Sequence, residues 1–504
     1  MLLRHLFRAV LICACFTEVQ GAELRMTVLD FDTGKPVPCR IHVKDTAGKP
    51  VRAAGLPFWR DHFVCAGTAQ LELSPGDYSY EIDRGTEYLV TTGTVKVTDS
   101  GTQTATNRLR RLANLSKEGW WSGDLHVHRP VSEIELLMQA EDLHVAPVIT
   151  WWNKLNLWNG RALPANPLVR FDGDRLYHVM GGEDERNGGA LMYFNLKGPL
   201  DIAGSGREYP PQMKFLEEAR QHPGVWVDIE KPFWYDVPVW LASGKVDSIG
   251  IAHNHMQRGG VLANEAWGRP RDKQRFPDPQ GNGFWTQEIY YHILNCGLRL
   301  PPSAGSASGV LPNPVGYNRA YVHLDGELTY EKWWAGLKAG RVFVSNGPLL
   351  RCRANGQLPG YVFMSPAGKS LEIKLSAKLD SRDPISAVEI VQNGRVIRTI
   401  PNSEWQRTGS LGTIQFQESG WFLVRVMADV PETFRFASTG PFYVEMGPTP
   451  RRVSKGSASF FLDWVRERMG RIKLDDPRQQ DEVIRFQREA ERFWQRKIQE
   501  ANAD

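Results

Sequence analysis

Two histidines in the segment Gly119–Arg129 (GWWSGDLHVHR) have the type and spacing of a metal-binding pair. In a β-strand alternate side chains lie on one face, so His126 and His128 should point in the same direction. Two imidazoles placed in this way can bind one divalent metal ion, although exposed histidines also alternate on strands that bind none. The context favours a metal, because the pair opens an α/β region, a helix follows it, and the acidic motif Gly181-Gly182-Glu183 comes later.

The elements that must position these residues lie between 116 and 348. Short apolar strands alternate there with amphipathic helices, which predicts parallel strands in an α/β layer or barrel. The clearest strands are Ala146–Thr150, Val225–Ile229 and Ser248–Ala252, and the clearest helices are Ser132–Glu141 and Pro211–Gln221.

Two strand-rich regions flank this part of the chain. Residues 23–115 and 349–447 alternate apolar and polar residues in short runs between turns, which predicts a β-sandwich on each side. The first sandwich is expected to be self-contained and to contribute no ligands. The tail, 448–504, is expected to be helical, with Asp475 or Asp476 as the cap and Pro477 in the first turn.

Two sequence segments resemble known families. TGKPVPCRIHVKDTAGKPV in the first sandwich resembles a carboxypeptidase-regulatory or transthyretin-like domain. GDLHVH at the start of the α/β region, between two sandwiches, resembles the carbaryl-hydrolase-like (CehA/McbA) branch of the PHP (polymerase and histidinol phosphatase) superfamily. This resemblance implies a multidomain α/β plus β protein: a distorted PHP-type (β/α) barrel flanked by two β-sandwich domains, with a helical C-terminal tail.

The resemblance also implies roles for individual residues. His126 and His128 match the family's first metal motif, and Glu183 matches its glycine–glutamate motif, which makes Glu183 the carboxylate ligand and a bridge if two metals bind. In this family the metals lie at the C-terminal mouth of the barrel and activate a water for hydrolysis.

Three other family motifs are lost. The chain has Thr150-Trp151-Trp152-Asn153 in place of Thr-Asp-His, Glu230-Lys231-Pro232 in place of His-Pro, and Gly305-Ser306-Ala307-Ser308-Gly309 in place of Gly-Ser-Asp-Ala-His. These losses argue against a trinuclear site and predict one ion, or at most two.

A second His-x-His pair offers replacement ligands. His253-Asn254-His255 follows the predicted strand Asp247–Ala252, at the C-terminal end of the strand, where the catalytic and binding residues of a barrel lie. His255 is expected to complete the ligand set, or His253 if the register differs by two, and a polar loop with hydrogen-bonding histidines is the alternative. Imidazole-rich ligands suit Zn, Mn or Fe, so the cofactor is expected to be one or two divalent ions of this group.

Charged residues near these motifs are candidates for catalysis. Lys231 stands where the family has a ligand histidine, and its ammonium could hold an anionic substrate group or stabilise an oxyanion. Arg129 could polarise the substrate in the same way. Carboxylates that could take a proton from a water are Asp124, Asp184, Asp228 and Glu230, and an ion pair with Lys231, Arg129 or Arg186 is the alternative role for each.

Tryptophan is abundant, with 17 residues, several of them in the α/β region. Indole faces suit sugar rings and other flat or apolar ligands, although most tryptophans must be core. Trp151 and Trp152 stand where a metal motif was lost, so at least one of them is a candidate for substrate binding.

Composition and the N-terminus restrict the class of protein. With 504 residues, 41% hydrophobic and 23% charged, the chain is expected to be globular with several folding units. The net charge of +4 without a long basic run gives no sign of a basic surface for binding nucleic acid. Residues 1–22 resemble an export signal, Cys15 could instead mark a lipoprotein, and no later stretch is apolar enough for a membrane span.

The four cysteines beyond the signal include no CxxC pair, which excludes zinc-ribbon chemistry. A Cys39–Cys65 disulfide in the first sandwich and buried free thiols both remain open.

Two functions follow from these patterns. The first is an exported hydrolase that uses a metal-activated water on an ester, amide or phosphoester. The alternative is a degenerate barrel that binds carbohydrate or another ligand through its tryptophans. Either would act on a small molecule or glycan, and the oligomeric state is left open.

Overall fold

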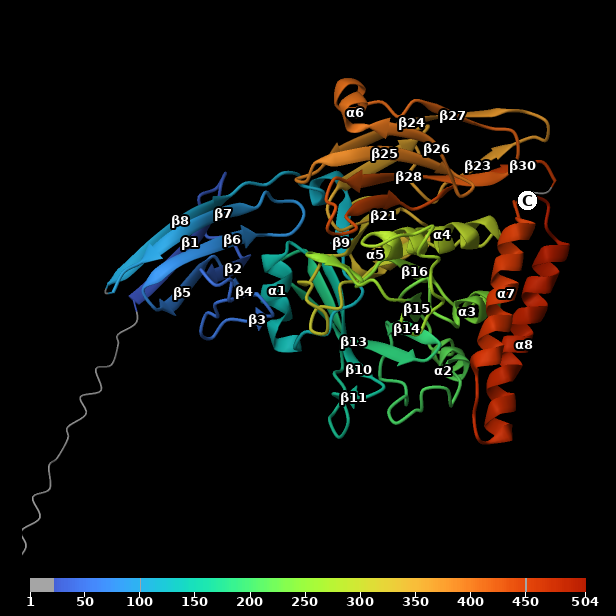
Figure 1. Ribbon diagram of the computed structural model, residues 1–504, viewed down its shortest axis with the longest axis horizontal. Helices are drawn as coiled ribbons and strands as arrows, with labels where there is room; N and C mark the ends of the chain where they lie inside the picture. Colours follow the sequence, from blue (N-terminus) through green and yellow to red (C-terminus); the bar gives the residue numbers. More distant parts are fainter. Residues whose placement is uncertain (1–21, 100, 449–450) are drawn as a thin grey trace, which may run out of the picture.

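The computed structural model describes residues 22–99, 101–448 and 451–504 of a mixed α/β chain with several sheets and a helical C-terminal part (Figure 1). The proposed export signal and Cys15 lie outside the described residues, except for Ala22, which begins the first strand. Among the described helices none combines the length and the apolar character that crossing a membrane requires.

The N-terminal part is built from two packed sheets, as the alternation predicts. Their buried faces share one hydrophobic core, in which Leu24 and Met26 pack with Ile41 and Phe63. One sheet has the order β5-β1-β8 and the other the order β3-β4-β2-β6-β7. The strands are β1 (Ala22–Asp30), β2 (Cys39–Asp45), β3 (Phe58–Trp59), β4 (His62–Cys65), β5 (Thr68–Leu73), β6 (Gly76–Asp83), β7 (Thr91–Val97) and β8 (Thr102–Leu109).

The central part has two groups of parallel strands around one core. β9, β10 and β13 are parallel neighbours, as are β15, β16 and β19, and the sheet closes on itself. β14 lies between the groups and is antiparallel to both neighbours, because a short turn joins it to β13. The strands are β9 (Trp120–Gly123), β10 (Val145–Trp152), β11 (Leu155–Asn156), β12 (Leu168–Phe171), β13 (Arg175–Arg186), β14 (Gly189–Phe194), β15 (Trp226–Ile229), β16 (Ser248–Ala252), β17 (Met256–Gln257), β18 (Gly260–Val261), β19 (Pro302–Ala304), β20 (Arg319–His323) and β21 (Val342–Ser345).

Helices connect several of the central strands along the chain. The predicted helices are present but shorter than expected, as α1 (Ile134–Ala140) and α2 (Gln212–Ala219). The pattern did not reveal α3 (Val237–Ser243), α4 (Gly281–Asn295) and α5 (Tyr330–Lys338). Two 3-10 turns, Ser116–Glu118 and Val131–Glu133, precede β9 and α1.

The second strand-rich part follows the central part along the chain and joins the same sheet, since β29 is the antiparallel neighbour of β21. Its own core contains Val388, Ile390 and Phe422. The elements are β22 (Leu349–Ala354), β23 (Val362–Ser365), β24 (Leu371–Asp380), β25 (Ile385–Gln392), β26 (Arg395–Pro401), α6 (Asn402–Thr408), β27 (Thr413–Phe416), β28 (Gly420–Ala428), β29 (Phe436–Thr439) and β30 (Phe442–Met446).

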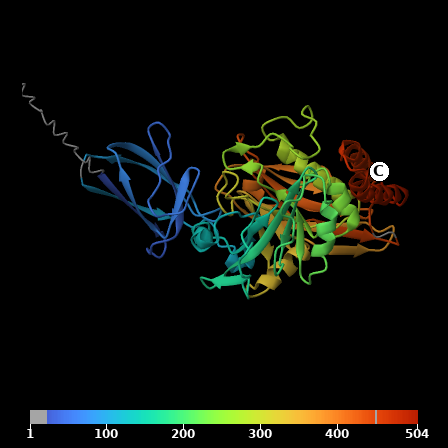
Figure 2. The same ribbon diagram turned by 90° about the horizontal axis from the view of Figure 1, so that it is seen from below.

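The tail forms two long helices, α7 (Lys455–Arg471) and α8 (Pro477–Gln499), which lie side by side against α3 (Figure 1). Asp476 caps α8 by accepting a hydrogen bond from the Arg478 backbone N at 2.8 Å. Val483, Phe486 and Ala490 form its buried face. Figure 2 shows this pair at one end of the molecule and the N-terminal sandwich at the other.

The N-terminal sandwich has a hydrophobic core of its own, and polar contacts join it to the central part. Arg40, only 2% exposed, donates to Asp83 at 2.5 Å within the sandwich and to Glu141 beyond α1 at 2.8 Å. Trp59 Nε1 donates to the Leu311 carbonyl at 2.7 Å. Buried charges must be paired, so this ion network fixes the sandwich to the central part.

Cys39 and Cys65 lie opposite each other on β2 and β4, with their sulfurs 3.8 Å apart. Both are buried free thiols, so the structure has no disulfide between them and matches the alternative of free cysteines.

Candidate metal centre

The His-x-His segment continues the line of β9 as extended chain between β10 and the segment after β19. Leu125 N donates to the Ala304 carbonyl at 3.0 Å, and His128 N donates to the Ser308 carbonyl at 2.8 Å. These bonds fix the alternation, and the two imidazoles point to the same side, with His126 Nε2 and His128 Nε2 3.1 Å apart.

Glu183 of β13 faces both imidazoles. Its Oε2 lies 3.0 Å from His128 Nε2, and its Oε1 lies 3.6 Å from His126 Nε2. In a tetrahedral site with bonds of about 2.0 to 2.1 Å, two ligand atoms are about 3.3 Å apart. The two imidazole nitrogens are close to this separation, and each Glu183 oxygen lies near one of them. One donor atom from each of His126, His128 and Glu183, here called the donor triangle, lies within 4.8 Å of the other two, so these residues fit a divalent ion.

The charges around this triangle favour a cation. Burial would lower the pKa of His126, yet the carboxylates of Glu183 and Glu230 raise it to about 10. Burial would raise the pKa of Glu183, but the two histidines hold it well below its usual range. The site thus stabilises positive charge between two imidazoles and a carboxylate, and a metal ion can take the place of a proton there.

Glu230, at the end of β15, orients His126. Its Oε1 lies 3.2 Å from His126 Nδ1, which leaves Nε2 turned toward Glu183. A carboxylate behind a histidine is the usual support of a metal ligand, since it fixes the ring and its tautomer. Lys231 Nζ and Trp234 Nε1, the latter at 3.1 Å, both donate to Glu230 Oε2.

Lys231 is therefore the ion-pair partner of Glu230. Its ammonium also lies 4.4 Å from the centre of the Trp234 ring, and its side chain is buried. This is the alternative role considered from the sequence, rather than a cation that points freely into the mouth of the site.

Asp124 and Arg129 have structural partners. Asp124 is fully buried and accepts hydrogen bonds from the backbone N–H groups of His126, Ser306 and Gly316, at 3.0, 3.0 and 2.7 Å. It thus fixes the backbone of the first ligand. Arg129 donates to Glu133 at 2.5 Å.

His253 and His255 lie outside the donor triangle, since the group of ligand atoms within 4.8 Å of one another consists of His126, His128 and Glu183. His253 Nε2 is 2.8 Å from the Thr286 hydroxyl, and both rings pack against Phe233. Burial lowers the pKa of each. These contacts match the alternative of hydrogen-bonding histidines.

The other carboxylates are held by neighbours. Asp184 accepts from Arg186 at 2.6 Å and from Asn153 at 2.5 Å, so the asparagine at the lost motif anchors β13. Asp228 accepts from the hydroxyls of Ser248 and Ser303, and burial raises its pKa to about 7.

The two candidate tryptophans have different surroundings. Trp151 is 1% exposed and stacks on Tyr193, so it belongs to the core. Its ring fills the space beside Gly182, where a Cβ would lie 2.0 Å from it, which explains the glycine before Glu183. Trp152 is half-buried and meets the His128 ring edge-on at 5.3 Å, so it can contact a substrate bound beside His128.

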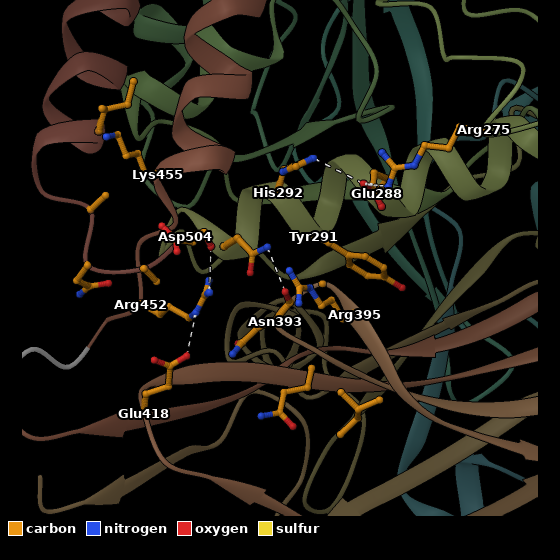
Figure 3. A pocket seen from close by; sticks show the side chains of 18 residues that line it. Arg275, Glu288, Tyr291, His292, Asn393, Arg395, Glu418, Arg452, Lys455 and Asp504 are labelled. Atoms are coloured by element: carbon orange, nitrogen blue, oxygen red, sulfur yellow. Dashed lines mark hydrogen bonds and ion pairs between the residues drawn. The ribbon is translucent and has the colours of Figure 1, made fainter. Parts of the chain in front are cut away.

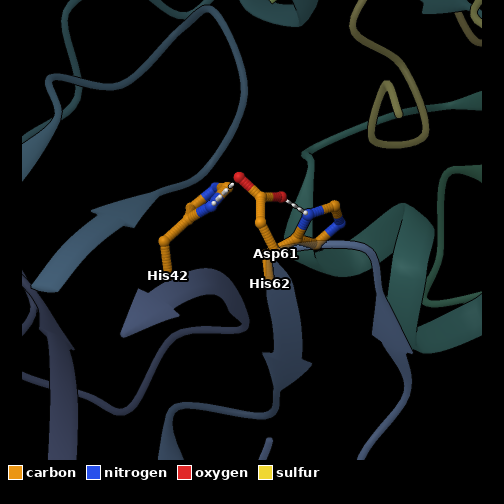
Figure 4. Close-up of side chains that lie close together, drawn as sticks. All are labelled: His42, Asp61 and His62. Carbon is orange, nitrogen blue, oxygen red and sulfur yellow. Dashed lines mark hydrogen bonds and ion pairs between the residues drawn. The ribbon is translucent and has the colours of Figure 1, made fainter. Parts of the chain in front are cut away.

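Sequence reasoning missed a second group of metal-type donors, formed by His42, Asp61 and His62 in the N-terminal sandwich (Figure 4). The only sequence signal was local: Asp61 and His62 are adjacent, and His42 lies in an alternating run.

A large pocket of about 1270 Å³ lies elsewhere, where α4, the turn between β25 and β26 and the C-terminus meet (Figure 3). Its lining includes Arg275, Arg395, Arg452, Glu418 and Asp504, and it shares no residue with the donor triangle.

Comparison with known proteins adds no family. No family model and no curated protein matches the chain. The Bacillus anthracis TIE protein is 18% identical over 22% of this chain and 20% of its own, with a TM-score of 0.15. The fibronectin(III)-like modules of Clostridium thermocellum CbhA are 16% identical over 26% of this chain and 62% of their own, with a TM-score of 0.14. At these scores neither likeness carries an argument.

Proposed function

We propose that the chain is an exported metal-dependent hydrolase of the PHP type, which binds one divalent ion through His126, His128 and Glu183. The observation that carries this is the donor triangle, in which the two imidazole Nε2 atoms are 3.1 Å apart and one donor atom from each residue lies within 4.8 Å of the other two. Export rests on the character of residues 1–22 alone.

An ion bound there would supply Lewis-acid activation of a water and of the carbonyl or phosphoryl oxygen of an ester, amide or phosphoester. The protein's own residues prepare the site for this. Glu230 holds the His126 ring, Asp124 holds its backbone, and Lys231 neutralises Glu230. Trp152 offers an apolar edge next to His128 for the substrate.

The proposal is tested with metal analysis and a panel of chromogenic esters, anilides and phosphoesters. Purified protein should carry about one ion of the Zn, Mn or Fe group at this site, and His128→Ala should remove that ion together with the hydrolysis. His222→Ala changes an exposed histidine in the loop after α2 and serves as the control.

The rival function, a glycan-binding protein, rests on Trp152 and on Trp267, which is 46% exposed. Metal binding without hydrolysis of any panel member, together with glycan binding that Trp152→Ala abolishes, would replace the hydrolase by this rival. Full metal content in His128→Ala would refute the proposed site itself.

A further inference from the structure

The His42–Asp61–His62 group lies in the N-terminal sandwich, outside the proposed hydrolase site. His42 is on β2, His62 begins β4, and Asp61 is in the turn that joins β3 to β4. His42 Nδ1 lies 3.1 Å from Asp61 Oδ2, and His62 Nδ1 lies 3.0 Å from Asp61 Oδ1 (Figure 4). One donor atom from each residue lies within 4.8 Å of the other two.

The fold brings these donors together from strands that pair. Ile41 and Phe63 are register partners in the β2–β4 ladder, and His42 and His62 are the next residues toward the turn. The centres of the two imidazole rings are 5.1 Å apart, and the ring planes are inclined at 48°. The turn holds Asp61 between them, with Arg60 in the left-handed region at φ 54°.

The surroundings leave the donors available. The two histidines are only 4% and 2% exposed, and Nε2 of His42 is buried without a hydrogen-bond partner. The Asp61 side chain is 34% exposed, which gives an ion bound there a side open to water. The nearby charge of Arg40 is already balanced by Asp83 and Glu141.

We infer that His42, His62 and Asp61 form a second metal site, which takes a divalent first-row transition ion such as Zn²⁺ or Co²⁺. Two imidazoles and one carboxylate with an open position are a donor set that such ions prefer, whereas Mg²⁺ and Ca²⁺ prefer oxygen ligands throughout.

An ion at this site would link β2 to the hairpin of β3 and β4. That hairpin contacts the central part, because Trp59 donates to the Leu311 carbonyl at 2.7 Å and its ring lies 5.4 Å from the Arg129 guanidinium. Arg129 directly follows His128, so the second site would stiffen the wall next to the proposed hydrolase site.

The test counts metal ions in the full chain. Wild-type protein, His42→Gln and His62→Gln are stripped with a chelator, dialysed against a slight excess of Zn²⁺ or Co²⁺, and analysed for metal per chain. Glutamine keeps a hydrogen-bond donor for Asp61 but is a poor ligand, so the fold should survive. We expect each variant to hold one ion fewer than the wild type, and His222→Gln, the exposed control, to hold the same number.

The same measurement in the His126→Ala/His128→Ala background separates the two sites. This background should keep one ion, which His62→Gln then removes. If the background keeps no ion, or keeps one that His42→Gln and His62→Gln leave in place, the second site is refuted whether or not the protein hydrolyses anything. If the background keeps the ion and wild type has no further one, the hydrolase site fails and the second site stands.

Melting temperature provides the folding check. After chelation, His42→Gln and wild type should have the same melting temperature. Zn²⁺ should raise the melting temperature of the His126→Ala/His128→Ala variant, but it should not change that of the triple variant that also carries His42→Gln. An equal rise in both would show that the ion binds elsewhere and would overturn the inference.

Discussion

Replacing Glu230 by glutamine should weaken metal binding at the donor triangle without removing any ligand. In the structure Glu230 Oε1 faces His126 Nδ1 at 3.2 Å, and its second oxygen is shared by Lys231 and Trp234. Glutamine keeps the shape of the side chain but loses the charge that orients and polarises the imidazole. Losing such a support costs about 10-fold to 100-fold in metal affinity, or roughly 1.4 to 2.7 kcal/mol.

The same change should also destabilise the fold, for a separate reason. Lys231 is buried, with a side-chain exposure of 5%, and Glu230 is the carboxylate it pairs with. Removing one member of a buried pair costs about 3 to 5 kcal/mol because the other charge is left uncompensated. Lys231→Met in addition to Glu230→Gln removes that charge, so the double variant should recover most of the stability.

The assay combines urea unfolding of metal-free protein with competition for Zn²⁺ against a fluorescent chelator. We expect Glu230→Gln to lose both stability and affinity, and the double variant to recover the stability while its affinity stays low. If the double variant also recovers wild-type affinity, Glu230 acts only as the partner of Lys231 and the orienting role is wrong.

Further predictions concern the core, the substrate edge, the domain contact and acid stability. Trp151→Ala should lower the free energy of unfolding, measured with urea, by about 3 to 5 kcal/mol, as expected for a buried tryptophan. Trp152→Ala should lower kcat/KM and leave the metal content unchanged. Arg40→Met should lower the free energy of unfolding by about 3 to 5 kcal/mol, because it leaves Glu141 buried without its partner. Arg25→Met removes an exposed ion pair and should change the free energy of unfolding by less than about 1 kcal/mol. Burial lowers the pKa of His144 to about 3 and that of His178 to about 4. The unfolded chain therefore binds more protons below about pH 6.5, and each histidine should remove about 1.4 kcal/mol of stability per pH unit as pH falls from there toward its folded pKa. Asparagine at both positions should flatten that pH profile, and an unchanged slope would contradict the assignment.

The arrangement of elements was predictable where local periodicity is strong. Strand Ser248–Ala252 matches β16, and the cap at Asp476 and the buried face of α8 follow the pattern. The antiparallel strand β14 was missed, since its buried residues show no alternation that distinguishes it from a parallel strand. Helix α4 was missed because it carries polar and apolar residues on all sides, and long-range packing rather than amphipathicity decides its position.

The candidate site was predictable to the extent that strand alternation fixes direction. The shared direction of His126 and His128 follows from strand alternation, whereas Glu183 was named from the family resemblance and lies within 4.8 Å of both. The partners of Lys231 and Asp124 did not follow, because they depend on hydrogen bonds between segments distant in the sequence, such as the bond from Gly316 N to Asp124. The same reason explains why His42 and His62 were not recognised as neighbours.

The charges at the donor triangle favour a single ion. Without metal, the carboxylates of Glu183 and Glu230 are balanced by Lys231 and by the proton on His126, whose pKa these carboxylates raise to about 10. Exchanging that proton for a divalent ion adds one positive charge, and a substrate anion or the hydroxide derived from water can compensate it. A second ion would add two more charges, yet the donor triangle contains one carboxylate. Lys231, at the position where the resembling family has a ligand histidine, already supplies part of the positive charge that such an ion would bring, so metal analysis should find one ion at this site even at high metal concentration.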